Sequence, residues 1–382
     1  MTRIELADAG DEVELRALVQ SSMLEQPFLL WYRFPAALKP FLDPENGDPF
    51  LAALLAPAMR AGEPLTIHAA VSPRLLRAAR EIQTIYHFWD GRLSPVPVEA
   101  PLRTELTPPR AGPPRAGLFF TLGVDSWYTL LKHEDEGART GPAVNDLIIV
   151  RGFDIPLRGP KAELIGEVFP RTAATARAFR KRLVPVATNI RDLSDGRLAW
   201  GRIYHGAAMA SIGLALEGLL DPIYFAGDQT YARIYPWGSH ALLDPLWSTE
   251  RLRFRHDGAE ATRIEKLRLI GRWPAALDQL RVCWENPDGA YNCGQCEKCV
   301  RTLICLQAAG LLGRCPTLPA SLDLSLLRRL RLETHRVQTR YIEIVNRLGN
   351  SDLDRTIKEI LEERIREGMA AAALKGIPRR WW

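Results

Sequence analysis

Short apolar runs alternate with segments of helical spacing through the middle of the chain. Four runs rich in β-branched and aromatic residues predict strands: AGLFFT, DLIIVRG, LVPVAT and PIYFAG. The run LRVCW is a candidate for a fifth strand. Helices are expected to begin near Val124, to end near Arg182 and to begin again near Ile203. Strands that alternate with helices are typical of βαβ units, so the pattern predicts an α/β fold around a five-stranded parallel sheet.

Breaks in this pattern predict three parts of the chain. Residues 1–108 mix helical and extended patterns and lead into LTPPRAGPPRAG, where four prolines and two glycines interrupt both kinds of element. Residues 321–375 have amphipathic helical spacing. We therefore predict an N-terminal α/β domain of unassigned role over residues 1–108, a sheet domain over 115–315 and a helical tail over 316–382.

Length and composition limit the possible classes of protein. The chain has 382 residues, 47% of them hydrophobic, which is enough for two domains or for one large domain with an appendage. Its apolar runs stay below the roughly 18 to 20 residues of a membrane span, and MTRIELADAGDEVEL is too acidic for a signal peptide. We expect a cytoplasmic protein that does not enter a membrane. The formal charge of +5 is spread along the chain and allows a polyanionic partner such as ATP or RNA.

The positions of the cysteines are more informative about function than the net charge is. Four of the six lie in the stretch CWENPDGAYNCGQCEKC, and in a cytosolic chain such clustering indicates a metal rather than disulfides. Two Cys-x-x-Cys steps place thiolates in one coordination sphere, and an earlier cysteine at a strand end can complete a tetrahedron around Zn²⁺. The spacing therefore predicts a closed, structural zinc site whose ligands are Cys283, Cys293, Cys296 and Cys299.

The turn TLGVDS follows the first strand of the predicted sheet. A glycine-containing turn between a strand and its helix is where such sheets bind phosphate, because backbone N–H groups and the positive helix end converge there. Thr121 offers a hydroxyl and Gly123 permits close approach. Asp125 and Ser126 fall in the first helical turn, where they are candidates for a phosphate site or, equally simply, for a helix cap.

The segment LFFTLGVDSWYTLL resembles the PP-loop of the ATP pyrophosphatase superfamily (adenine nucleotide alpha-hydrolases, HUP type), whose signature is Ser-Gly-Gly-x-Asp-Ser after the first strand. Leu122 departs from it, because it replaces the first glycine. The resemblance covers about residues 115 to 305. It implies a Rossmann-like sheet and cleavage of ATP to AMP and pyrophosphate. The residues that it implies for ATP and Mg²⁺ are Thr121, Gly123, Val124, Asp125 and Ser126, with Asp125 and Ser126 as catalytic residues.

The cysteine segment, including CGQC, resembles the 7-cyano-7-deazaguanine synthase family (QueC) within that superfamily. All four cysteines match its zinc ligands. An iron–sulfur cluster, as in some PP-loop tRNA thiolases, is the competing interpretation, but those sites generally use three cysteines. The resemblance implies that a carboxylate or carbonyl oxygen is adenylated and that ammonia or an amine then displaces AMP.

Other functions and partners stay open at this stage. A PP-loop sulfurtransferase acting on tRNA or a metabolite is one alternative. A non-catalytic nucleotide-binding partner subunit is another, because Leu122 interrupts the signature. The expected partner is a small-molecule acid or a deazapurine-like compound, with a protein or tRNA as a macromolecular acceptor and a homodimer left open.

Further candidates follow from position in the predicted sheet. Val150, Arg151 and Gly152 end the second strand, where the superfamily's backbone meets adenine, although Arg-Gly is also an ordinary turn. Lys266, in ATRIEKLRLI, is a catalytic candidate that would place a cation toward a triphosphate, as would Arg263. The alternative is a solvated helix face.

Candidate substrate contacts lie on the same predicted edge of the sheet. His205 opens the helix after the third strand, and Asp228 follows the fourth. In the loop TYARIYPWGSHALLDPLWSTE we assign substrate contact to Trp237, Ser239 and His240. The loop also contains an aspartate, but it has no nucleophile elbow, so we reject a Ser-His-Asp triad.

Overall fold

A computed structural model of the chain describes residues 3–104, 115–137 and 139–374. The chain divides into two compact units, and each is described by itself. Unit 1 comprises Met1–Phe120, His133–Gly227 and Pro236–Asp257. Unit 2 comprises Thr121–Lys132, Asp228–Tyr235 and Gly258–Trp382.

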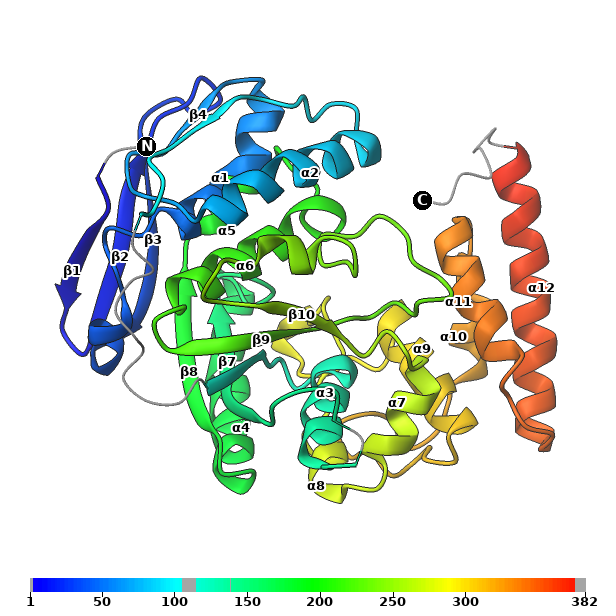
Figure 1. The fold of residues 1–382 in the computed structure, drawn as a ribbon. Coiled ribbons are helices and arrows are strands. Elements are labelled where there is room, and N and C mark those ends of the chain that lie inside the picture. Colours follow the sequence, from blue (N-terminus) through cyan, green and yellow to red (C-terminus); the bar gives the residue numbers. More distant parts are fainter. Residues whose placement is uncertain (1–2, 105–114, 138, 375–382) are drawn as a thin grey trace. The chain divides into compact units, whose positions relative to one another are not determined.

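Unit 1 is built on one mixed eight-stranded sheet in the order β1-β2-β3-β8-β7-β6-β9-β10 (Figure 1). Strands β1 to β3 are antiparallel to one another, and β3 is antiparallel to β8. The strands from β8 to β10 in that order are all parallel. The bounds are β1 (Glu5–Ala9), β2 (Glu12–Val19), β3 (Phe28–Pro35), β6 (Arg115–Phe119), β7 (Val144–Arg151), β8 (Arg182–Thr188), β9 (Leu220–Ala226) and β10 (Phe254–Asp257).

The α/β fold is confirmed, and the sheet is larger than predicted. AGLFFT, DLIIVRG, LVPVAT and PIYFAG contain β6, β7, β8 and β9, respectively. The prediction of a strand at LRVCW is wrong: residues 280–284 form none, since the N–H groups of Val282 and Cys283 donate to Asn292 Oδ1 instead of to a neighbouring strand. The fifth parallel strand is β10, in the polar sequence FRHD.

Helices cover both faces of this sheet (Figure 1). On one side lie α1, α2, α5 and α6, and α4 packs on β7 and β8. Helix α6 is buried on nearly every side, and its Ala and Gly residues let α1 approach closely. The bounds are α1 (Asp48–Ala61), α2 (Pro73–Trp89), α4 (Ile165–Ala178), α5 (Ile190–Ser194) and α6 (His205–Ala215).

Two predicted helix ends differ from the structure. Helix α4 ends at Ala178 instead of near Arg182, because β8 already begins at Arg182. Helix α6 begins at His205, after a π-helical turn η3 (Trp200–Tyr204). Short elements complete unit 1: a parallel pair, β4 (Leu65–Thr66) and β5 (Val98–Glu99), and the 3₁₀ turns η1 (Ala36–Phe41), η2 (Pro160–Leu164) and η4 (Asp244–Trp247).

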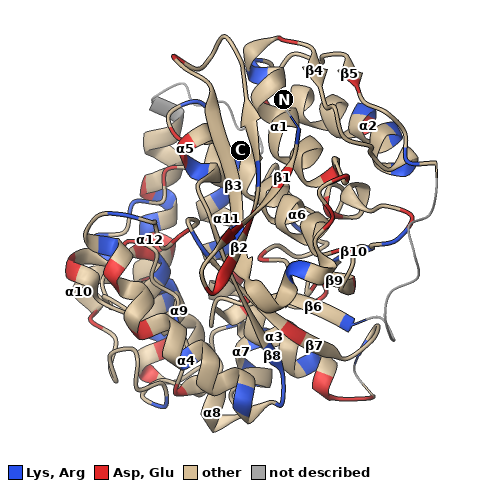
Figure 2. Cartoon of the chain, turned by 90° about the vertical axis from the view of Figure 1, so that its left-hand side faces the viewer, with Lys and Arg blue, Asp and Glu red and all other residues tan. Residues whose placement is uncertain are grey.

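Unit 2 is helical in its described part. Helix α7 begins with a capping box in which Thr262 and Glu265 satisfy each other's backbone N–H groups, so Glu265 serves the helix start. Positive and negative residues are interspersed along α12 (Figure 2). The bounds are α3 (Val124–Glu134), α7 (Arg263–Ile270), α8 (Pro274–Leu277), η5 (Pro287–Gly289), α9 (Glu297–Ala308), α10 (Leu324–Arg328), α11 (His335–Val345) and α12 (Asp352–Leu374).

The predicted partition into 1–108, 115–315 and 316–382 stays a prediction. Residues 105–114 and 375–382 lie outside the described residues. Strands β1 to β3 share one sheet and one unit with the parallel strands. Among the helices described here, none is both long and apolar enough to cross a lipid bilayer.

Candidate functional site

The turn after β6 contains a leucine in the backbone conformation of a glycine. Leu122 has a φ of 61° and is fully buried, and its carbonyl accepts a hydrogen bond of 2.9 Å from the Arg281 N–H. A left-handed backbone costs a residue with a side chain about 1–2 kcal/mol. Glycine takes this conformation without that cost, so a glycine would suit this position.

Ser126 ties this turn to the start of α3. Its hydroxyl donates to the Gly123 carbonyl at 3.1 Å and accepts from the Thr121 N–H at 3.3 Å. A Cβ on Gly123 would lie 3.0 Å from Thr121 Oγ1, so the turn leaves little room for a side chain there. The Trp127 N–H closes the first helical bond to Gly123. Ser126 thus shapes the turn itself.

Asp125 forms an ion pair with a lysine predicted separately as a catalytic residue. Lys266 Nζ lies 2.8 Å from Asp125 Oδ1, and Arg263 approaches Asp125 Oδ2 at 3.9 Å. Lys266 is 1% exposed, so it is not part of a solvated helix face. Burial acts to raise the pKa of the Asp125 carboxyl, but Lys266 and Arg263 hold that pKa below its ordinary value. This corner therefore holds a carboxylate with two cations beside it.

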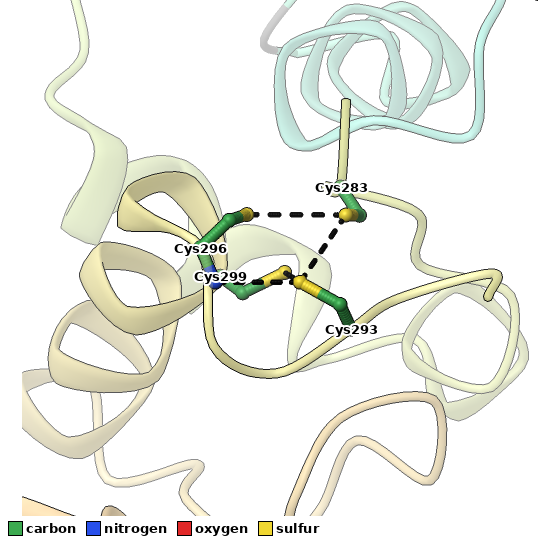
Figure 3. Close-up of side chains that lie close together, drawn as sticks. All are labelled: Cys283, Cys293, Cys296 and Cys299. Atoms are coloured by element: carbon green, nitrogen blue, oxygen red, sulfur yellow. Dashed lines mark hydrogen bonds between the residues drawn. The ribbon is translucent and has the colours of Figure 1, made fainter. Parts of the chain in front are cut away.

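The four predicted cysteines converge in unit 2 (Figure 3). Their sulfur atoms all lie within 4.8 Å of one another. The separations are 3.5 Å for Cys283 and Cys293, 3.8 Å for Cys283 and Cys296, and 3.9 Å for Cys293 and Cys299. A tetrahedron of thiolates around Zn²⁺ at about 2.3 Å has sulfur separations of roughly 3.8 Å. The cluster could hold a metal ion such as zinc.

Backbone N–H groups donate to two of the four cysteine sulfur atoms. The Asn286 N–H donates to Cys283 Sγ at 3.2 Å, and the Cys296 N–H donates to Cys293 Sγ at 3.3 Å. Cys296 is the N-cap residue of α9, where the positive helix end stabilises negative charge. A hydrogen bond from Cys299 lowers the pKa of the Cys296 thiol to about 5, and the same contact raises the pKa of Cys299.

The other two cysteines are buried apart from this cluster. Cys315 Sγ donates to the Leu277 carbonyl at 3.3 Å, and burial raises the pKa of Cys305 to about 11. Neither belongs to the group of four sulfur atoms that could share a metal. A cysteine that is close to the cluster in the sequence is therefore not necessarily part of it in the structure.

In unit 1, Asp244 organises the loop that contains Ser239 and His240. Ser239 Oγ donates to Asp244 Oδ2 at 2.8 Å, and His256 Nδ1 lies 2.6 Å from the same oxygen. The His240 N–H donates to Asp244 Oδ1, while its ring Nδ1 accepts from the Leu242 N–H. The serine proton points to a carboxylate and not to a histidine. Burial lowers the pKa of His240 and favours its neutral ring.

His205 uses both ring nitrogens in local contacts. Nε2 accepts from the Ser239 N–H at 3.2 Å, so Nδ1 carries the proton toward the Trp200 carbonyl at 3.3 Å. A Cβ on Gly238 would lie 2.5 Å from His205 Nδ1, and the Trp237 ring lies 5.8 Å from the imidazole. These contacts fix the loop on α6, and a role of His205 or Trp237 in substrate binding stays a prediction.

The end of β7 forms a tight turn. Gly152 has a φ of 104°, and a Cβ there would lie 1.9 Å from the Thr188 carbonyl oxygen, so only glycine fits. Arg151 donates to the Leu157 carbonyl at 3.1 Å. Turn geometry alone thus accounts for Arg151 and Gly152, and contact with adenine stays a prediction for residues 150–152.

Asp228, predicted as a substrate contact, forms an ion pair with Arg340 at 3.0 Å in unit 2. The same guanidinium donates to the Tyr235 hydroxyl. Together with Arg301, these residues line a cavity of about 60 Å³ that the sequence did not suggest. In the sequence, the arginines of α9 and α11 have the spacing of an ordinary charged helix face. This spacing gives no sign that they meet at one cavity.

The predicted residues therefore fall into two sets. Unit 1 contains Val150, Arg151, Gly152, His205, Trp237, Ser239 and His240. Unit 2 contains Thr121, Gly123, Val124, Asp125, Ser126, Asp228, Lys266 and the four clustered cysteines. Within unit 2, the structure brings Asp125 to Lys266 and brings the cysteines to one another.

Comparison with known proteins found no match to a family model, to a curated protein or to a solved structure.

Proposed function

We propose that the chain is an ATP-dependent, AMP-forming enzyme of the PP-loop type, most like the 7-cyano-7-deazaguanine synthases. The observation that carries the proposal is the left-handed backbone of Leu122. The chain keeps the conformation that the signature glycine would serve although the residue has changed. Two further features support it: the turn directly follows β6, and β6 is central among five parallel strands in the order β8-β7-β6-β9-β10.

ATP would be held at the start of α3. Backbone N–H groups and the positive helix end attract phosphate there, with Thr121, Gly123, Val124 and Ser126 around the pyrophosphate. Lys266 contributes a buried positive charge beside this turn. The carboxylate of Asp125 is an oxygen ligand of the kind that Mg²⁺ prefers, although Lys266 would compete with that ion for the carboxylate.

ATP supplies an activated phosphoryl group in the proposed reaction. A carboxylate oxygen of the substrate attacks the α-phosphorus, and the bond to pyrophosphate breaks. Ammonia or an amine then attacks the carbonyl carbon, loses a proton, and AMP leaves with the oxygen. The contribution expected from this chain is to orient the phosphates and to stabilise charge on the departing pyrophosphate. Zinc at the four cysteines would hold the segment between residues 283 and 299 in place.

A second candidate function is a nucleotide-binding subunit without turnover. Two observations favour it: the fully buried Leu122 side chain in the turn, and the neutralisation of Asp125 by Lys266. Such a protein would bind ATP without releasing pyrophosphate.

The decisive experiment incubates the purified chain with ATP, Mg²⁺, ammonia and a panel of small carboxylic acids. Release of AMP and pyrophosphate that depends on one of the acids supports the enzyme. ATP binding without pyrophosphate release supports the second candidate. Elemental analysis of the same preparation measures the bound metal. Zinc agrees with the proposal, whereas iron would favour the sulfurtransferase alternative.

A further inference from the structure

A cavity of about 60 Å³ lies among α7, α9, α11 and the segment Asp228–Tyr235, all in unit 2. A water molecule needs about 10–15 Å³ of such volume, so the cavity has room for roughly five waters. That is the size of one small polar group. A whole nucleotide needs a larger pocket.

Four arginines and two carboxylates line this cavity, and two more carboxylates, Asp125 and Glu297, approach Arg263 and Arg301 from outside the lining. Arg301 comes from α9, Arg340 from α11 and Arg263 from α7. The arginines are held in place by acidic neighbours: Arg340 by Asp228 at 3.0 Å, and Arg301 by Glu297 at 3.0 Å. The side chains of Arg263, Arg301 and Arg340 are 12–20% exposed, so these three positive charges are largely shielded from water.

Gln229 gives independent evidence for a ligand. It lines the cavity and is 5% exposed. Its Oε1 accepts a hydrogen bond of 2.8 Å from the Tyr235 N–H, which fixes the orientation of the amide. Its Nε2 is buried and has no partner among the described residues. A buried donor without an acceptor is costly, and an anionic oxygen in the cavity would satisfy it.

We propose that this cavity binds the oxyanion group, a carboxylate or a phosphate, of a small acidic ligand. Guanidinium groups match both oxyanions through paired hydrogen bonds, and Gln229 Nε2 supplies a neutral donor. The volume admits the anionic group while the remainder of the ligand stays outside. The proposal does not rest on nucleotide turnover: an anion site of this kind would serve an enzyme or a binding subunit equally.

Calorimetric titration of the full chain without ATP tests this proposal. The probes are inorganic phosphate, malonate, and malonamide as a neutral analogue of malonate. We expect saturable binding of phosphate or malonate with a Kd of about 0.1–1 mM at low ionic strength, and no binding of malonamide. Preference between the first two probes identifies the oxyanion. Saturable binding of malonamide, or no binding of either anion, would overturn the proposal.

Two variants locate the site, and a third is their matched control. Gln229→Glu keeps the oxygen that accepts from Tyr235 but replaces the free donor by a negative charge, so Kd should rise at least about tenfold. Arg340→Gln should have a similar effect. Arg347→Gln makes the same change two residues after the end of α11, at a residue that does not line the cavity. Equal weakening in Arg347→Gln, or unchanged affinity in folded Gln229→Glu, would contradict the assignment.

Discussion

Asp125 and Lys266 stand 141 positions apart in the chain and form an ion pair at 2.8 Å in unit 2. Lys266 is almost fully buried, while the Asp125 side chain is 22% exposed. A buried ammonium group is tolerated only when it is paired with a negative charge. The packing of α7 and the conformation of the turn after β6 therefore depend on each other.

Asp125→Asn should destabilise the protein, because it leaves the buried Lys266 charge without its carboxylate. We expect a loss of about 2–3 kcal/mol in the free energy of unfolding, measured by urea denaturation. Lys266→Met should also destabilise, but the double variant should lose less than the sum of the two. Strict additivity in this cycle would show that the pair contributes no coupling.

The same pair predicts a response to acid. The pKa of Asp125 is lower in the folded chain than the roughly 3.9 of an unfolded aspartate. Its stabilising contribution is therefore present above about pH 4 and is lost as the pH falls through the folded pKa. Asp125→Asn should accordingly show a smaller loss of stability below pH 4 than the parent chain does. If Asp125→Asn and the parent chain lose the same stability below pH 4, this assignment is contradicted.

Leu122 allows a test of backbone strain. At ordinary helical positions alanine is more stable than glycine by about 1 kcal/mol. At a φ of 61° the order should reverse, so Leu122→Gly should be more stable than Leu122→Ala by about 1 kcal/mol. Both should be less stable than the parent, because a buried leucine is lost.

Leu131 is the matched control, because it is a buried leucine inside α3. There the alanine variant should be the more stable of the two. Thermal denaturation of the four variants gives both differences in one experiment. The assignment of a left-handed backbone to residue 122 fails if alanine is favoured at both positions.

Local features of the chain were predictable from the sequence. The cysteine site was found because Cys293, Cys296 and Cys299 lie within seven residues, so a single turn brings their sulfur atoms together. Strands β6 to β9 were found because buried parallel strands are continuous apolar runs. In both cases the physical cause acts between near neighbours in the chain.

Long-range relationships were not predictable in the same way. Strand β3 pairs with β8 across more than 150 positions, where Thr188 Oγ1 donates to the Trp31 carbonyl. Strand β10 was missed because His256 and Asp257 make it look like a loop, although Asp244 binds the histidine. The sequence offered Asp125 and Lys266 as separate candidates, but no local pattern encodes their contact.

The cysteine cluster predicts a metal-dependent unit 2. Cys296→Ser should reduce bound zinc from about one ion per chain and lower the free energy of unfolding by at least about 3 kcal/mol. Cys315→Ser is the control, because Cys315 is buried but does not belong to the cluster. It should keep its zinc. Elemental analysis and thermal denaturation measure the two effects, and equal zinc in both variants would exclude Cys296 as a ligand.

A second buried network, in unit 1, links Asp48 to Arg103 and Glu217. Arg103 binds Asp48 at 2.6 Å and Glu217 at 2.5 Å, and the Ser72 N–H donates to Asp48 at 2.7 Å. Burial and the neighbouring Glu217 raise the pKa of Asp48 to about 7, although Arg103 opposes the shift. An unfolded aspartate titrates near 3.9. Between these two values the folded chain binds a proton that the unfolded chain does not.

Stability should therefore fall as the pH rises from about 4 to about 7, by at most about 1.4 kcal/mol per pH unit from this group. Asp48→Asn should flatten that slope, as measured by urea denaturation at several pH values. Glu250→Gln is the control beside Ser72: burial acts to raise the pKa of Glu250, but the Ser72 hydroxyl holds it below its ordinary value. The effect of Glu250→Gln on the pH dependence of stability should therefore lie below about pH 4. A slope that survives in Asp48→Asn would assign the proton uptake to another group.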